Sequence, residues 1–144
     1  MTPVFRRPSR LGILFLALFL AGCGESELKK NKTYPAEGKV LINGEPAAFV
    51  MVYLSPTDPK QGAEATGVTG EDGTFQLRTY NNEDFDGAVP GKYTVTLEAY
   101  HPVESVGVTI PPGAKPTPLS DKVLEAKIPV EIKAENNTLE INVP

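Results

Sequence analysis

The chain contains no tryptophan, one cysteine and one histidine among its 144 residues. Because Cys23 is alone, it has no internal disulfide partner. His101 stands before a proline, and no catalytic or metal-binding motif surrounds it. Beyond the N-terminal apolar run, no segment repeats apolar residues at three- and four-residue spacing over ten positions, as a long amphipathic helix would. We therefore expect a non-helical protein that is not an enzyme and has no cofactor.

Long apolar runs are also scarce, and the one present, Leu11–Ala21, is too short for a permanent membrane span. A basic head with Arg6, Arg7 and Arg10 precedes it, and small residues follow it. This order is typical of a secretory signal peptide. The residues at its end are Leu20, Ala21, Gly22 and Cys23.

This four-residue ending resembles the lipobox of bacterial lipoproteins. The resemblance implies that Cys23 carries acyl chains such as palmitate and that the signal peptide, residues 1–22, is removed. Two or three chains would give stable anchoring, with the domain facing the periplasm or the cell surface. In some proteobacteria, an aspartate directly after the cysteine keeps a lipoprotein in the inner membrane. Gly24 stands at that position here, so we expect delivery to the outer membrane. The alternative is an ordinary cleaved signal peptide with an incidental cysteine.

Positive charge is scarce in the chain that would remain. Removing 22 of 144 residues leaves 122, with eleven basic and eighteen acidic side chains and a net charge of −7. This balance argues against nucleic acid as a partner. The expected partners are the membrane, through the anchor, and an envelope protein or polysaccharide.

Residues 23–34 are polar and without periodicity, and we expect a lipidated cysteine followed by a flexible tether. Residues 35–144 instead alternate apolar and polar residues between short turn signals. This pattern predicts an all-β, seven- to eight-stranded antiparallel β-sandwich, transthyretin-like or immunoglobulin-like. The predicted strands are 40–42, Phe49–Ser55, Ala65–Thr69, Phe75–Thr79, Lys92–Tyr100, Val106–Ile110, 128–132 and 139–143, with turns at Asn43-Gly44, Gly70–Gly73 and Asn136-Asn137.

Four motifs in this order resemble a known family. They are Gly38–Ala48, Val52–Pro56, Gly67–Leu77 and Gly87–Val95. Together they are similar to the carboxypeptidase regulatory-like domain, a transthyretin-like (prealbumin-like) sandwich, as found in small planctomycete lipoproteins. The resemblance implies a non-catalytic accessory module used for protein–protein interaction or structural support. An enzyme is a remote alternative.

Two kinds of binding site stay open. The acidic loop with Glu83, Asp84 and Asp86 is a weak calcium candidate, and a solvated acidic loop is the alternative. Long loops at the ends of a rigid sandwich could instead carry recognition. Exposed apolar residues there would favour a protein partner, and an aromatic pair such as Tyr80 with Phe85 would favour a carbohydrate. The three loops are Thr57–Glu64, Asn81–Val89 and His101–Pro118.

Overall fold

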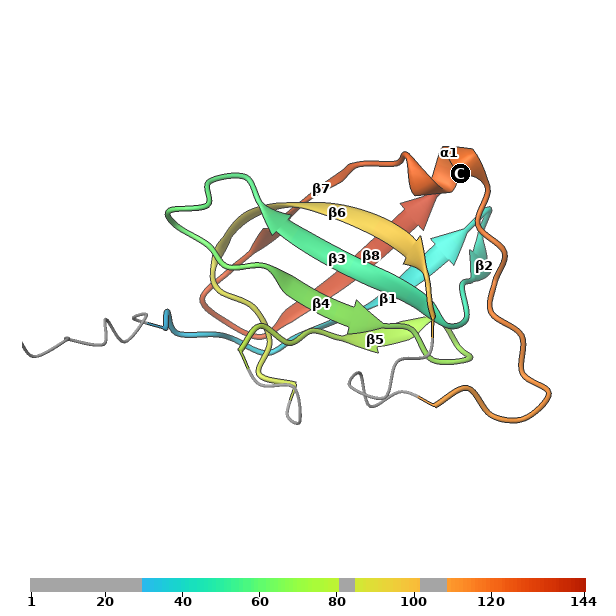
Figure 1. Cartoon of the computed structure of the whole chain (residues 1–144). Helices are drawn as coiled ribbons and strands as arrows, with labels where there is room; N and C mark the ends of the chain where they lie inside the picture. Colours follow the sequence, from blue (N-terminus) through green and yellow to red (C-terminus); the bar gives the residue numbers. More distant parts are fainter. Residues whose placement is uncertain (1–29, 81–84, 102–108) are drawn as a thin grey trace, which may run out of the picture.

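The computed structural model describes residues 30–80, 85–101 and 109–144. They form two sheets that pack face to face as a β-sandwich (Figure 1), which confirms the predicted fold class. The first sheet contains β1 (Ala36–Ile42), β2 (Glu45–Pro46), β5 (Thr74–Gln76) and β8 (Asn137–Val143), and the second contains β3 (Val50–Pro56), β4 (Ala65–Val68), β6 (Gly91–Ala99) and β7 (Ile128–Ile132).

The core follows the alternation of side chains along the strands. In β6, Tyr93, Val95 and Leu97 are almost completely buried, as their spacing predicts. In β1, Val40 faces the same core, while Glu37 on the alternate face is exposed. The sandwich therefore has its main apolar core between the two sheets.

The hairpin predicted at Asn43-Gly44 joins β1 to β2. Asn43 and Gly44 have φ angles of 52° and 82°, so both residues adopt the left-handed conformation of a tight hairpin turn. Ile42 pairs with Glu45 directly across that turn. Local turn chemistry thus sets this register, as expected.

One pairing departs from the antiparallel prediction. β8 lies parallel to β1 over all seven residues, from Ala36 opposite Asn137 to Ile42 opposite Val143. Parallel neighbours require a crossover connection rather than a hairpin. Residues 43–136 separate these two strands, so local sequence patterns carry no signal for their relative direction.

Two further local expectations are corrected. Phe49 precedes β3 rather than opening it, because its φ angle of 53° is left-handed. A one-turn helix, α1 (Asp121–Leu124), also forms, and it buries Val123. Four residues are too few for a periodic signal. Within the described ranges, no helix is long and apolar enough to cross a membrane.

A second, smaller cluster covers the outer face of β3. The buried side chains of Phe49, Val68 and Tyr100 pack there against Ile110 and Ala114 of the connection to α1. The same connection is joined to the chain before β3, because Thr117 N donates to Ala48 O at 2.8 Å and Ala48 N donates to Thr117 Oγ1 at 2.8 Å. The outer face at the start of β3, where Met51 lies, is consequently covered by this connection. Most of the expected strand Val106–Ile110 lies outside the described residues.

Asn137 organises the turn between β7 and β8. Its Oδ1 accepts from Lys133 N at 2.8 Å, and its Nδ2 donates to Lys133 O at 3.0 Å and to Glu135 O at 2.6 Å. The residue is buried, whereas its neighbour Asn136 is exposed. Of the two asparagines predicted to form this turn, Asn137 is therefore the one whose side chain holds the turn together.

We expect Asn137→Ala to lower the free energy of unfolding by about 1–3 kcal/mol, because it removes three part-buried hydrogen bonds between this side chain and the backbone of the turn. Asn136→Ala should change it by less than about 0.5 kcal/mol, as at an ordinary exposed site. Urea unfolding of both variants checks this. Equal losses would contradict the role assigned to Asn137.

Candidate functional site

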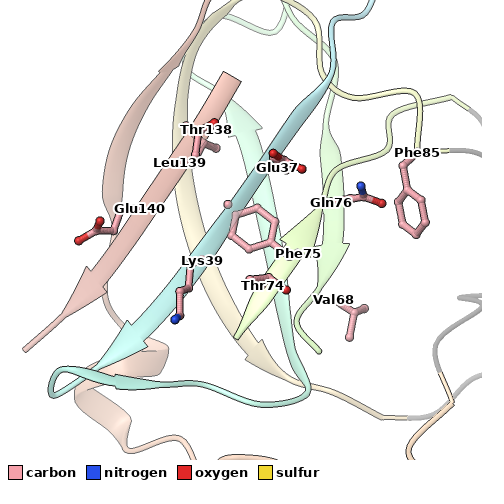
Figure 2. Close-up of a pocket in the computed structure, with 11 residues that line it drawn as sticks. Glu37, Lys39, Val68, Thr74, Phe75, Gln76, Phe85, Thr138, Leu139 and Glu140 are labelled. Carbon is pink, nitrogen blue, oxygen red and sulfur yellow. The ribbon is translucent and has the colours of Figure 1, made fainter. Parts of the chain in front are cut away.

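An open groove crosses the outer face of the first sheet. It has a volume of about 680 Å³, and polar side chains from three neighbouring strands line it (Figure 2). β1 contributes Glu37 and Lys39, β5 contributes Thr74 and Gln76, and β8 contributes Thr138 and Glu140. These residues share the groove because each stands on the outward face of its strand.

The groove is mixed in charge. Lys39 of β1 stands opposite Glu140 of β8 in the parallel register, and Glu37 stands opposite Thr138. One amine, two carboxylates, two hydroxyls and an amide therefore face the same space. Such a surface can exchange hydrogen bonds with a polar chain, while its near-neutral balance gives no attraction for a highly charged polymer.

Phe85 adds an apolar side chain at the edge of this groove. It is 50% exposed, and it lines both the groove and a smaller adjoining hollow of about 200 Å³. Figure 2 shows its ring beyond Gln76, on the side away from β8. The Arg78 guanidinium lies 5.9 Å from the centre of the ring. Because this cation–π contact helps to hold the ring in place, Phe85 presents a supported apolar surface next to polar groups.

The loop that carries Phe85 is held by its neighbour Asp86. Oδ1 of Asp86 accepts from Thr79 N at 2.7 Å, and Oδ2 accepts from Tyr80 N at 3.0 Å. Thr79 Oγ1 also donates to Gly87 O at 2.8 Å. Both carboxylate oxygens of Asp86 thus accept backbone hydrogen bonds that hold the two ends of the loop together.

This arrangement bears on the calcium candidate. Of its three residues, Glu83 and Asp84 lie outside the described residues, and Asp86 is engaged as above. Over residues 30–80, 85–101 and 109–144, no group of three histidine, cysteine, aspartate or glutamate side chains could hold a metal ion. His101 is exposed. Cys23 and the residues Leu20, Ala21 and Gly22 before it also fall outside the described part.

Tyr80 and Phe85, which the sequence suggested as an aromatic pair, have different surroundings in the structure. Tyr80 is half-buried, its hydroxyl accepts from Asn31 N at 3.2 Å, and Lys30 Nζ lies 5.6 Å from the centre of its ring. Tyr80 therefore contacts the segment that leads into the sandwich, whereas the exposed Phe85 and the buried Phe75 line the groove. The spacing of the two residues in sequence carries no signal for these different surroundings.

A second hollow lies under the loop between β3 and β4. Its volume is about 430 Å³, and its lining includes Gly62, Lys92, Tyr93 and Glu131. Tyr93 Oη donates to Val89 O at 2.6 Å, and burial raises the pKa of this phenol. The hydroxyl is therefore a neutral structural donor rather than an acid at ordinary pH.

Comparisons with known proteins give little further information. No family model matches the sequence, and no curated protein matches it. A crystal structure of a DUF3823 family protein from Parabacteroides merdae is similar, with 15% identity and a TM-score of 0.49. The match covers 79% of this chain and 47% of that one, so this chain spans less than half of that protein. Nothing in these comparisons indicates catalysis, and the family resemblance seen in the sequence motifs stays a prediction.

We expect Asp86→Ala to lower the free energy of unfolding by about 1–3 kcal/mol, because it removes two charge-assisted hydrogen bonds. Asp86→Asn keeps one acceptor oxygen, so it should lower the free energy of unfolding by less than Asp86→Ala does. Glu64→Ala, at an exposed carboxylate in another loop, serves as the charge-matched control. Denaturant unfolding of the three variants checks whether their losses in the free energy of unfolding follow this order. A loss for Glu64→Ala equal to that for Asp86→Ala would contradict it.

Proposed function

We propose that this chain is an exported, lipid-anchored accessory protein of the bacterial envelope, and that its sandwich binds another envelope protein without catalysis. The open groove of the first sheet, with the exposed Phe85 at its edge, is the observation that supports binding. The lipobox-like residues before Cys23 support the anchor. The motif resemblance to carboxypeptidase regulatory-like domains is consistent with this role.

A protein partner fits the groove better than the alternatives. An exposed phenyl ring beside polar groups is the composition of a small protein-binding surface, in which an aromatic side chain anchors contacts and a polar rim surrounds it. The mixed charge of Glu37, Lys39 and Glu140 suits a partner that carries both signs. A partner segment could lie along the strands, since the groove is open and lies over β1, β5 and β8.

A carbohydrate is the second candidate. The groove offers hydroxyl, amide and carboxylate groups that can bond to sugar hydroxyls, and Phe85 could contact the apolar face of a sugar ring. It offers one exposed ring rather than an aromatic pair, because Tyr80 is used elsewhere. We therefore rank this function second.

The anchor is tested with Cys23→Ala in the full chain. We expect loss of acylation and retention of the uncleaved precursor, because the cysteine thiol is the only acceptor in the motif. Intact mass and membrane extraction measure both effects. A mature, membrane-extracted Cys23→Ala protein would overturn the proposed anchor.

The binding face is tested by two matched charge reversals. Glu140→Arg alters the groove, and Glu98→Arg alters an exposed position on the opposite sheet. After crosslinking in cells and capture through a C-terminal tag, we expect one protein in near-equal amount from wild type and Glu98→Arg. Recovery should fall about tenfold for Glu140→Arg or Phe85→Ala, which is a loss of about 1.4 kcal/mol.

The other outcomes separate the candidates. Polysaccharide recovered in place of a protein, and lost in the same two groove variants, would favour the carbohydrate function. Equal effects of Glu140→Arg and Glu98→Arg would contradict the groove as the binding face.

A further inference from the structure

The segment that leads into the sandwich is attached to one end of it. Asn31 N donates to the Tyr80 hydroxyl at 3.2 Å, and Lys30 Nζ lies 5.6 Å from the centre of the Tyr80 ring. Tyr34 then pairs with Ala88, with N–O distances of 2.9 and 3.0 Å in the two directions. Residues 30–34, the last part of the expected tether, thus contact the folded domain.

Gly87 makes this attachment possible. Its φ angle is 85°, and a side chain at this position would run into the carbonyl oxygen of Tyr34. Only glycine permits so close an approach of the two backbones. The attachment of Tyr34 is therefore a feature of the fold.

The strand pairings show which loops share this end. Ala36 pairs with Asn137, Gly91 with Ile132, and Leu54 with Ala65. The entry end of the sandwich thus comprises Tyr34, the loop 57–64 and the turn 133–136. The far end comprises the hairpin turn 43–44, the turn 70–73 and α1. Figure 1 shows the two ends on opposite sides of the molecule.

We propose that the entry end faces the membrane surface at short range and that the far end points away from it. This proposal rests on the lipid anchor at Cys23 proposed above. Only the seven residues 23–29 would then separate the lipid from the attached Lys30, and seven residues span at most about 25 Å. The short connection limits how far the entry end can move from the headgroups.

Charge is compatible with this orientation. Among the described loop residues of the entry end, Lys30, Lys32, Lys60 and Lys133 balance Asp58, Glu64, Asp86 and Glu135. The chain from residue 23 onward is acidic as a whole, and these four lysines lie on the end that would face anionic headgroups. Lys30 and Lys32 are exposed and stand nearest to the anchor.

This orientation also determines which loops an envelope partner can reach. The loop 57–64 and Phe85 lie at or near the entry end, whereas the described part of His101–Pro118 covers the far part of β3. The groove of the first sheet lies on the side of the sandwich, between the two ends. A partner in the envelope can therefore reach the groove and the far end, while the loop 57–64 faces lipid.

The absence of tryptophan allows a direct test, because each introduced tryptophan is the sole indole fluorophore. Gln61→Trp labels the entry end and Glu45→Trp labels the far end, and both positions are exposed. Each full-length variant is expressed, extracted from membranes and reconstituted in phosphatidylethanolamine–phosphatidylglycerol vesicles that contain a dansyl-lipid acceptor. Energy transfer from each tryptophan to the lipid is then compared.

We expect transfer from Gln61→Trp to exceed that from Glu45→Trp by at least about twofold, because seven-residue strands separate the ends by about 23 Å. Inserting a long Gly-Ser repeat after Glu27 should make the two values converge, since a longer flexible tether frees the domain. Tyr80→Leu should reduce the difference, and Tyr80→Phe, which keeps the ring, should reduce it less. Equal transfer in the unmodified chain, or the reverse order, would overturn the proposed orientation.

Failure of the anchor is distinguished by intact mass. If Cys23 carries no acyl chain, the proposed anchor is wrong. The same protein is then coupled to a maleimide lipid through Cys23, its only thiol, and the energy-transfer comparison is repeated. Unequal transfer after coupling would still support the orientation set by the attached segment, and equal transfer would overturn it.

Discussion

Where β5 meets β4, the two sheets are joined at an aromatic ring that packs against two glycines. Phe75 of β5 lies between Gly38 of the first sheet and Gly67 of the second. A methyl group at Gly38 would lie 2.7 Å from its Cζ, and one at Gly67 would lie 3.3 Å from its Cδ2. The added methyl groups would also meet backbone oxygens, Leu139 O at Gly38 and Gln76 O at Gly67, the latter at 2.6 Å. Glycine at both positions therefore lets the ring and the backbone pack closely at this junction.

The chain after Phe75 strengthens the same junction. Leu77 N donates to Ala36 O of the first sheet at 2.9 Å, and Arg78 and Thr66 of the second sheet exchange two backbone hydrogen bonds of 2.9 Å. One short segment therefore joins both sheets within two residues. Thr79 and Tyr80 follow this segment and donate to Asp86, and the Tyr80 hydroxyl accepts from Asn31 N. The loop that carries Phe85 and the attachment of residues 30–34 therefore both depend on this junction.

The parts of the fold that the sequence predicted are those governed by neighbouring residues. Asn43-Gly44 forms the expected hairpin because its left-handed conformation is a property of those two residues. Tyr93, Val95 and Leu97 are buried because alternation along a strand is local. Phe49 shows the limit of this reasoning. A left-handed aromatic residue costs roughly 1–2 kcal/mol, and burial against Val68 and Tyr100 offsets it by about 1.5–3 kcal/mol, a contact that no local pattern contains.

The sequence by itself determined the strand faces, the tight turns and the acidic balance, and it predicted the anchor at Cys23. Only the tertiary structure decided that β8 lies parallel to β1 and that Glu37 and Glu140 share a groove. It also placed Tyr80 against Lys30 and Asn31, and Phe85 on the groove. The reason is that turns and alternation depend on residues a few positions apart, whereas the groove and the attachment join segments separated by about fifty to one hundred residues, whose pairing is set by the packing of the whole core.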